Sequence, residues 1–92
     1  MVLIKRLILD VLKPHSPNSL EFARVLAEQG PNYHVTITVT EVDEKTETVV
    51  IVVESHDIQF DLLVDAISSL GGSLHSIDEV EVLNVTASTE ND

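Results

Sequence analysis

The stretch Gly71-Gly72-Ser73-Leu74-His75-Ser76-Ile77-Asp78-Glu79-Val80 decides how this chain folds. Its two glycines are typical of a helix C-terminus, where the backbone often enters the left-handed region. The residues that follow resemble a strand, but Ile77 and Val80 are out of phase for simple alternation. This break predicts a bulge or a late strand start near Asp78. We therefore expect a helix before Gly71 and a last strand from about Leu74 to Val85.

The segment before these glycines has the periodicity of an amphipathic helix. Phe60, Leu63, Ile67 and Leu70 recur at i, i+3, i+7 and i+10, which places them on one helical stripe. Asp57 precedes them and is a residue type that favours the N-cap position. The pattern predicts a helix from about residue 57 to residue 70.

Two strand-like segments precede this helix. Residues 33–43 alternate between apolar and polar side chains and are rich in β-branched residues, as in a half-exposed sheet. Residues 47–55 contain Val49-Val50-Ile51-Val52-Val53, which is apolar on both faces and predicts a central strand buried on both sides. The polar residues 43–46 between the two segments are short enough for a hairpin turn.

The N-terminal part predicts one more strand and one more helix. Residues 3–13 read as a strand that Pro14 ends. Pro17 suits the first turn of a helix with Ser16 as its N-cap, and Gly30 stops that helix.

The predicted element order is β-α-β-β-α-β, in the α+β class. Right-handed crossovers make it a split βαβ, ferredoxin-like sandwich, with an antiparallel sheet of strand order 4-1-3-2 and both helices on one face. Residues 1–85 form one domain, and residues 86–92 form a flexible polar tail. The predicted core contains Leu7, Leu9, Val35, Ile37, Leu63 and Ile67.

The composition narrows the classes of partner. Five basic and sixteen acidic residues give a net charge of −11, which disfavours nucleic acid and anionic membrane surfaces. The chain has no cysteine, which excludes disulfides and thiolate chemistry and fits a reducing cytoplasm. We find neither a run of ~18 apolar residues nor a signal-peptide pattern, so we expect a cytoplasmic protein.

Four blocks of sequence carry a resemblance to a known family. They are Leu9-Asp10-Val11-Leu12-Lys13-Pro14-His15, Glu21-Phe22-Ala23, Thr40-Glu41-Val42-Asp43 and the stretch from Gly71 to Val80. Together they resemble, over roughly residues 3 to 82, an archaeal family of small proteins known as domain of unknown function 211. The resemblance implies a ferredoxin-like fold and a homo-oligomer with a ring-like arrangement. It implies no activity, because the family has no established one.

The histidines are the main candidates for chemistry. From the predicted topology we expect all four, His15, His34, His56 and His75, at the same end of the sheet. His15 and His75 would lie at the centre of a metal site that Asp78 and His56 complete. Imidazole with carboxylate suits Zn, Ni or Co. The alternatives are solvated or capping histidines, and a hard divalent cation held by Asp and Glu across subunits.

Apolar residues on the other side of the predicted sheet indicate self-association. Ile8 and Leu12, with one parity of Val49 to Val53, form an apolar stripe on the face without helices, and such patches are uncommon on monomers. Asp10 lies on this same face. A pair with Arg6 or Lys13, or an interface hydrogen bond, is favoured for Asp10 over a role as catalytic acid.

Three functions remain open. The first is an oligomeric binding or regulatory module for a small molecule or cation at subunit junctions, a use known for other ferredoxin-like domains. The second is a scaffolding oligomer without a ligand, and the third is an enzyme with a histidine–carboxylate metal site. No nucleophile elbow, phosphate loop or dinucleotide fingerprint favours the third function.

Overall fold

The structure, a computed structural model, describes residues 1–86. The elements are β1 (Val2–Pro14), α1 (Ser19–Ala27), β2 (His34–Val42), β3 (Thr46–Glu54), α2 (Phe60–Ser69) and β4 (Ser73–Asn84). Their order, β-α-β-β-α-β, is the predicted one. The predicted tail, residues 86–92, lies outside the described residues except for its first residue.

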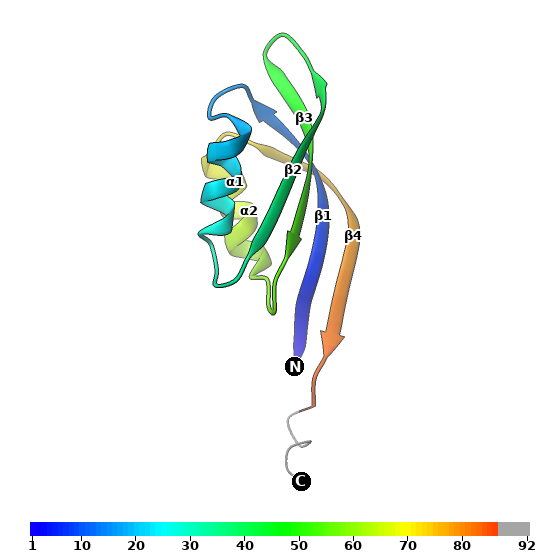
Figure 1. Cartoon of the computed structure of the whole chain (residues 1–92). Helices are drawn as coiled ribbons and strands as arrows, with labels where there is room; N and C mark the ends of the chain where they lie inside the picture. Colours follow the sequence, from blue (N-terminus) through cyan, green and yellow to red (C-terminus); the bar gives the residue numbers. More distant parts are fainter. Residues whose placement is uncertain (87–92) are drawn as a thin grey trace.

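The four strands form one antiparallel sheet. Its order is β2-β3-β1-β4, which reads 4-1-3-2 from the β4 edge. β1 is paired with β3 from Arg6 to Pro14 and with β4 from Val2 to Leu12. α1 and α2 lie side by side on one face of this sheet, and the opposite face has no helix (Figure 1).

The core lies between the helices and the inner strands. Alternate residues of β1 and β3 point to the helices, because side chains of a strand alternate between the two faces of a sheet. The residues of these strands and helices that form the buried apolar cluster are Leu7, Leu9, Val11, Val49, Ile51, Val53, Phe22, Leu26, Leu63, Ala66 and Ile67. Four predicted core residues are among them, and the other two, Val35 and Ile37, are partly buried against this cluster.

Both helices begin later than predicted. Asn18, not Ser16, is the N-cap of α1, and its side chain accepts a hydrogen bond from the backbone N–H of Glu21. Gln59, not Asp57, is the N-cap of α2 and makes no side-chain capping bond. The sequence offered several residues that can cap a helix near each start, and composition alone did not choose between them.

The junction between α2 and β4 follows the prediction. Gly71 has a positive φ of 89°, which glycine adopts without steric cost. Gly72 lies against the core: a Cβ there would be 3.0 Å from both Ile67 Cγ2 and Phe22 Cζ. The pairing with β1 shifts register between Glu79 and Ile77, so the bulge predicted near Asp78 is confirmed.

The prediction that β3 is buried on both sides is wrong for the single chain. Val49, Ile51 and Val53 are buried, but Val50 and Val52 lie on the face without helices and are only half-buried.

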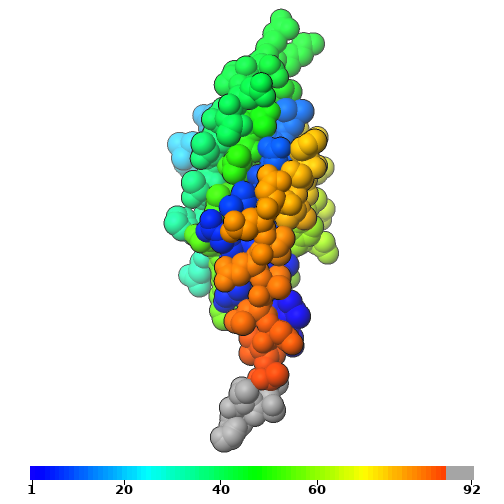
Figure 2. All heavy atoms as spheres, turned by 90° about the vertical axis from the view of Figure 1, so that its right-hand side faces the viewer, coloured from blue at the N-terminus to red at the C-terminus, as the bar shows by residue number. Residues whose placement is uncertain are grey.

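Figure 2 shows the side of the molecule on which β4 crosses the surface beside β1, with the helices behind the strands. Within residues 1–86, no helix is long and apolar enough to cross a membrane.

Candidate functional site

The four histidines lie at two ends of the sheet, and the expectation of one shared end is wrong. β1 and β2 are both antiparallel to β3, so they run in the same direction. His15 follows β1 at the end where β4 begins with Ser73, so His15 and His75 share this end. His34 faces Glu54 in the β2–β3 register, and His56 follows two residues later, at the opposite end.

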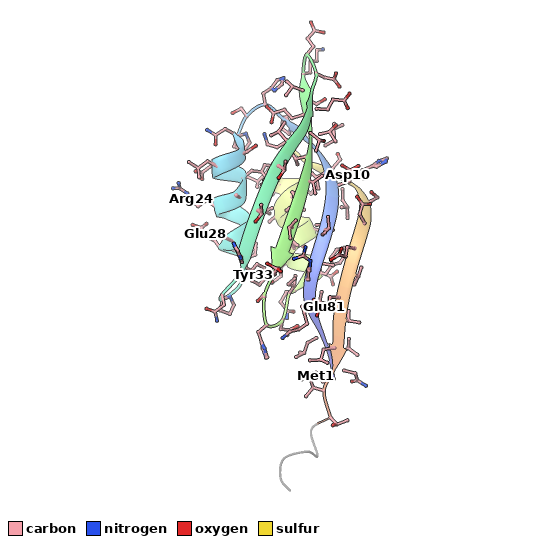
Figure 3. The ribbon with its side chains drawn as sticks, turned by 45° about the vertical axis from the view of Figure 1, so that its right-hand side comes forward. Met1, Asp10, Arg24, Glu28, Tyr33 and Glu81 are labelled. Atoms are coloured by element: carbon pink, nitrogen blue, oxygen red, sulfur yellow. The ribbon has the colours of Figure 1, made fainter. Side chains whose placement is uncertain are left out.

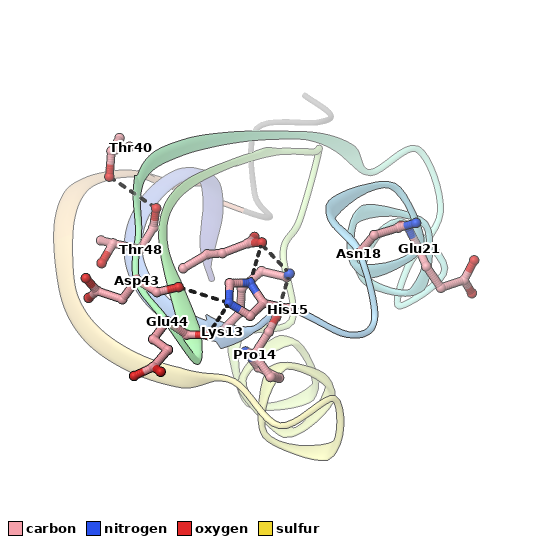
Figure 4. Close-up of polar contacts among 10 residues, drawn as sticks. Lys13, Pro14, His15, Asn18, Glu21, Thr40, Asp43, Glu44 and Thr48 are labelled. Carbon is pink, nitrogen blue, oxygen red and sulfur yellow. Dashed lines mark hydrogen bonds and ion pairs between the residues drawn. The ribbon is translucent and has the colours of Figure 1, made fainter.

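His15 joins the end of β1 to the β2–β3 hairpin. Its Nδ1 lies 3.0 Å from Glu47 Oε2, and its Nε2 lies 3.0 Å and 3.1 Å from the carbonyl oxygens of Asp43 and Glu44 (Figure 4). A carboxylate and two carbonyls are acceptors, so both ring nitrogens must donate, and the ring fits this geometry as an imidazolium. Neither nitrogen then has a lone pair for a metal ion.

The pKa values around His15 follow from the same contacts. The hydrogen bond to Glu47, aided by the carbonyls of Glu44 and Asp43, raises the pKa of the His15 imidazole above its usual value. The hydrogen bonds from His15 and then from Lys13 lower the pKa of the Glu47 carboxyl. The contacts therefore favour the ionised form of both side chains, the imidazolium of His15 and the carboxylate of Glu47.

Lys13 extends this cluster into the core. Its side chain is fully buried, and its Nζ donates to the carbonyl oxygen of Pro14 at 2.7 Å and to Glu47 Oε1 at 3.2 Å. The ammonium also lies 5.6 Å from the centre of the Phe22 ring, within reach of a cation–π interaction. The Lys13–Glu47–His15 cluster therefore stabilises the hairpin end of the fold. Of the alternatives for Asp10, the pair with Lys13 is wrong, because Lys13 binds Glu47 instead.

The other candidate ligands do not gather around His15. Asp78 accepts a hydrogen bond of 2.7 Å from Ser76 Oγ on the exposed part of β4. His56 Nδ1 lies 3.2 Å from Lys5 Nζ, an ammonium that only donates, so this nitrogen acts as an acceptor. In the part of the chain that the structure describes, no three histidine or carboxylate side chains lie close enough to hold a metal ion.

His75 belongs to a different site, on the face without helices. It lines a pocket of about 210 Å³ with Asp10, Leu12 and Thr48, at the junction of β4, β1 and β3. Asp10 alternates with the core residues of β1, and its position on that strand is labelled in Figure 3. His15, by contrast, engages Glu47, which faces the buried Lys13 across the β1–β3 register. His15 and His75 thus share one end of the sheet but serve opposite faces.

Asp10 is the unexpected member of this pocket. Its side chain is half-buried and has no hydrogen-bond or ion-pair partner within residues 1–86. The expected partner Arg6 instead binds Glu54 and Glu79, and these two hydrogen bonds, Glu79 first, raise the pKa of its guanidinium. The sequence placed Asp10 on the face without helices by its strand parity, and this is confirmed, but its proximity to His75 depends on the register of β4.

A larger hollow of about 330 Å³ lies where α2 begins, beside the start of β1. Its walls include Val2, Ile4 and the carboxylates of Asp57 and Asp61. Carboxylates at a helix N-terminus are stabilised by the helix dipole. The helix dipole alone accounts for the Asp57 and Asp61 carboxylates, so this hollow gives no sign of a ligand. The Asp10–His75 pocket is the stronger candidate site.

The architecture is that of a small acidic α+β protein with one helix-covered sheet face and one open face that carries the pocket lined by Asp10 and His75. The chain belongs to an archaeal family of uncharacterised proteins, domain of unknown function 211, described as "Uncharacterized ArCR, COG1888", which it matches over residues 5–89. It is also 44% identical over 77 residues to the uncharacterized protein MJ0319 of Methanocaldococcus jannaschii. That match covers 84% of this chain and 79% of the relative.

Proposed function

We propose that the protein is a ferredoxin-like, homo-oligomeric binding module of the cytoplasm that holds a cation or small molecule at its subunit junctions. The element order, the antiparallel sheet and the placement of both helices on one face support the ferredoxin-like description. The absence of cysteine is compatible with a cytoplasmic location.

The observation that carries the proposal is the apolar surface of the open sheet face. Ile8 faces Val52 across the β1–β3 register, and Leu12 and Val50 extend the same patch. Leu12 is 42% exposed, and the other three are half-buried without any helix above them. A contiguous apolar patch of this kind marks an interaction surface.

A second copy of the chain is the occupant that fits this surface. At one end of the face the charges are paired within the chain, because Arg6 binds both Glu54 and Glu79, and its guanidinium offsets one of the two carboxylate charges. On β2, the residues opposite Val50 and Val52 are Thr38 and Thr36, which are uncharged. Apart from Asp10, the central part of this face is apolar or uncharged and can pack on its own copy, as an isologous interface requires.

The strands at the two edges of the sheet offer a further contact. β2 and β4 each have one edge that pairs with no strand among the described residues. β4 also exposes Val80 and Val82. Such edges favour pairing with another chain, and pairing of β4 with β2 of the next copy is a head-to-tail contact of the kind that closes rings.

Light scattering and native mass spectrometry test this proposal. We expect the wild type to give a multiple of the 10.1 kDa chain mass, and Val50→Glu, which puts a charge on the apolar patch, to shift it toward the monomer. Leu20→Glu adds the same charge at an exposed position of α1, on the other side of the sheet, and is the matched control. Protein purified without chelator should carry a reproducible bound mass. An oligomer without a bound mass would instead favour the function as a scaffolding oligomer. A wild-type monomer at micromolar concentration would overturn the proposal.

A further inference from the structure

We infer that two copies of the chain, related by a two-fold axis over the open sheet face, bind one divalent transition-metal ion between them through Asp10 and His75 of each copy. This inference rests on the proposed function and specifies the ligand and its site. It begins from the pocket that Asp10 and His75 line together on the face without helices.

Both ionisable side chains of this pocket are unengaged in the single chain. Neither the Asp10 carboxylate nor the His75 imidazole makes a hydrogen bond or ion pair with another residue of 1–86. His75 is exposed, whereas Asp10 is half-buried on a central strand between apolar neighbours. The two side chains therefore line the same pocket with their potential metal ligands, carboxylate oxygens and ring nitrogens, unengaged.

The position of Asp10 makes its lack of a partner significant. It lies between Ile8 and Leu12 on β1 and faces Val50 of β3, in the middle of the proposed contact surface. A carboxylate that is covered without a counter-charge is strongly destabilising. Association through this face therefore requires something positive next to Asp10.

The two-fold relation explains why that positive group is a metal ion. In an isologous contact each residue near the axis meets the same residue of the partner, so two Asp10 carboxylates approach each other and repel. A divalent cation between them neutralises both charges. The His75 imidazole of each copy coordinates the same ion, so the two Asp10 and two His75 side chains supply four protein ligands.

Four ligands of this type match a known coordination set. Zn²⁺ is most often four-coordinate, and imidazole with carboxylate also suits Co²⁺ and Ni²⁺. One chain supplies two of the four donors from this pocket, which agrees with the absence of any three-ligand cluster within residues 1–86. The site is incomplete without the second copy.

The test is a titration of Zn²⁺ into metal-free protein, followed by calorimetry and by sedimentation. We expect one Zn²⁺ per two chains and an association at least ~10-fold tighter with Zn²⁺ than without it, as for any ligand that binds only the paired state. Ca²⁺, which prefers six or more oxygen ligands, should produce neither effect. One Zn²⁺ per chain, or binding that leaves the subunit mass unchanged, would overturn the inference.

Four variants make the test specific. Asp10→Asn and His75→Gln should each lower Zn²⁺ affinity at least ~10-fold, the scale on which the loss of ligand interactions is felt. Asp61→Asn and His34→Gln change the same residue types outside the pocket and should bind as the wild type does. Without metal, Asp10→Asn should associate at least as tightly as the wild type, because it removes the repulsion between carboxylates. Weaker metal-free association of this variant would count against the two-fold placement of Asp10.

The two proposals fail in different ways. A protein that stays monomeric with and without Zn²⁺ contradicts both the homo-oligomeric module and the shared metal site. A protein that assembles equally well in the presence of chelator and of Zn²⁺, with Asp10→Asn and His75→Gln unchanged in either condition, retains the assembly and removes the metal site alone.

Discussion

Glu47 and His15 are 32 positions apart in the sequence, yet Glu47 Oε2 lies 3.0 Å from His15 Nδ1, and this pair fastens the β2–β3 hairpin to the end of β1. The other nitrogen of the ring faces the carbonyls of Asp43 and Glu44 in the same hairpin. Because every partner of the ring is an acceptor, the attachment depends on the protonation of His15.

Stability should therefore fall as pH rises through neutrality. The pKa of His15 is raised in the folded state, so its contribution is complete below the unfolded value of ~6.5 and is lost as pH rises through the folded value. The pKa of Glu47 is lowered, so its contribution is complete above its ordinary value of 4.5 and is lost as pH falls through the folded value. The pair contributes most between these two ordinary values.

Urea unfolding at about pH 6 and about pH 9 measures this dependence. The wild type should lose more stability over that interval than His15→Gln, which cannot gain the proton. His34→Gln removes an exposed histidine whose Nδ1 lies 3.7 Å from Glu54 at the other end of the sheet, and it should follow the wild type. An equal change in His15→Gln and the wild type would show that His15 does not titrate in the way the geometry requires.

The buried lysine should be needed for stability even though it is charged. Lys13→Met keeps the apolar stem but leaves the Pro14 carbonyl and Glu47 without the ammonium. We expect a loss of about 1–3 kcal/mol in the free energy of unfolding, the cost of a buried polar group left unpaired. Lys45→Met, in the exposed turn, should change it by less than about 0.5 kcal/mol. Similar values for the two variants would contradict this account of Lys13.

The contact of Gly72 with the core predicts that even one methyl group is costly there. In Gly72→Ala the new Cβ would be 3.0 Å from Ile67 Cγ2 and Phe22 Cζ, and 3.2 Å from the Ile67 carbonyl oxygen. We expect about 1–3 kcal/mol of destabilisation from this overpacking, measured by urea unfolding. Ser73→Ala, at the neighbouring exposed position, is the control. If Gly72→Ala were as stable as this control, the core would rearrange around the new methyl group without loss of stability.

The charge of −11 predicts that salt stabilises both the fold and its assembly. Repulsion between like charges weakens as the Debye length decreases from ~10 Å at 0.1 M to ~3 Å at 1 M salt. Thermal melts at these two concentrations of potassium chloride should show a higher Tm in the second. A Tm that is constant or falls would mean that self-repulsion is not a major term, and that local pairs such as Arg6–Glu54 dominate the electrostatics.

The sequence predicted the elements and the core because their signals are local. Leu63 and Ile67 lie on one helical stripe, and Val35 and Ile37 alternate on a strand, so their burial follows from periodicity within a few residues. The bulge at Asp78 was visible for the same reason, as a break in alternation.

The site was harder to predict because it depends on strand direction and register. A correct strand order does not suffice: one wrong assumption about the direction of β2 relative to β1 moves His34 and His56 to the other end of the sheet. The partner of Lys13 and the pocket neighbour of Asp10 were missed for a related reason. Glu47 and His75 reach them only through pairing between strands, which no local pattern specifies.

The complete enclosure of Lys13 also has a consequence for chemical reactivity. An amine-reactive reagent needs access to the nitrogen, and Lys13 has no accessible surface, whereas Lys45 is exposed and Lys5 is partly exposed. Acetylation of the folded protein should thus spare one lysine of the three. The rate at which the mass of a peptide containing Lys13 then increases would report how often the hairpin separates from the end of β1, without any label or mutation introduced into the chain.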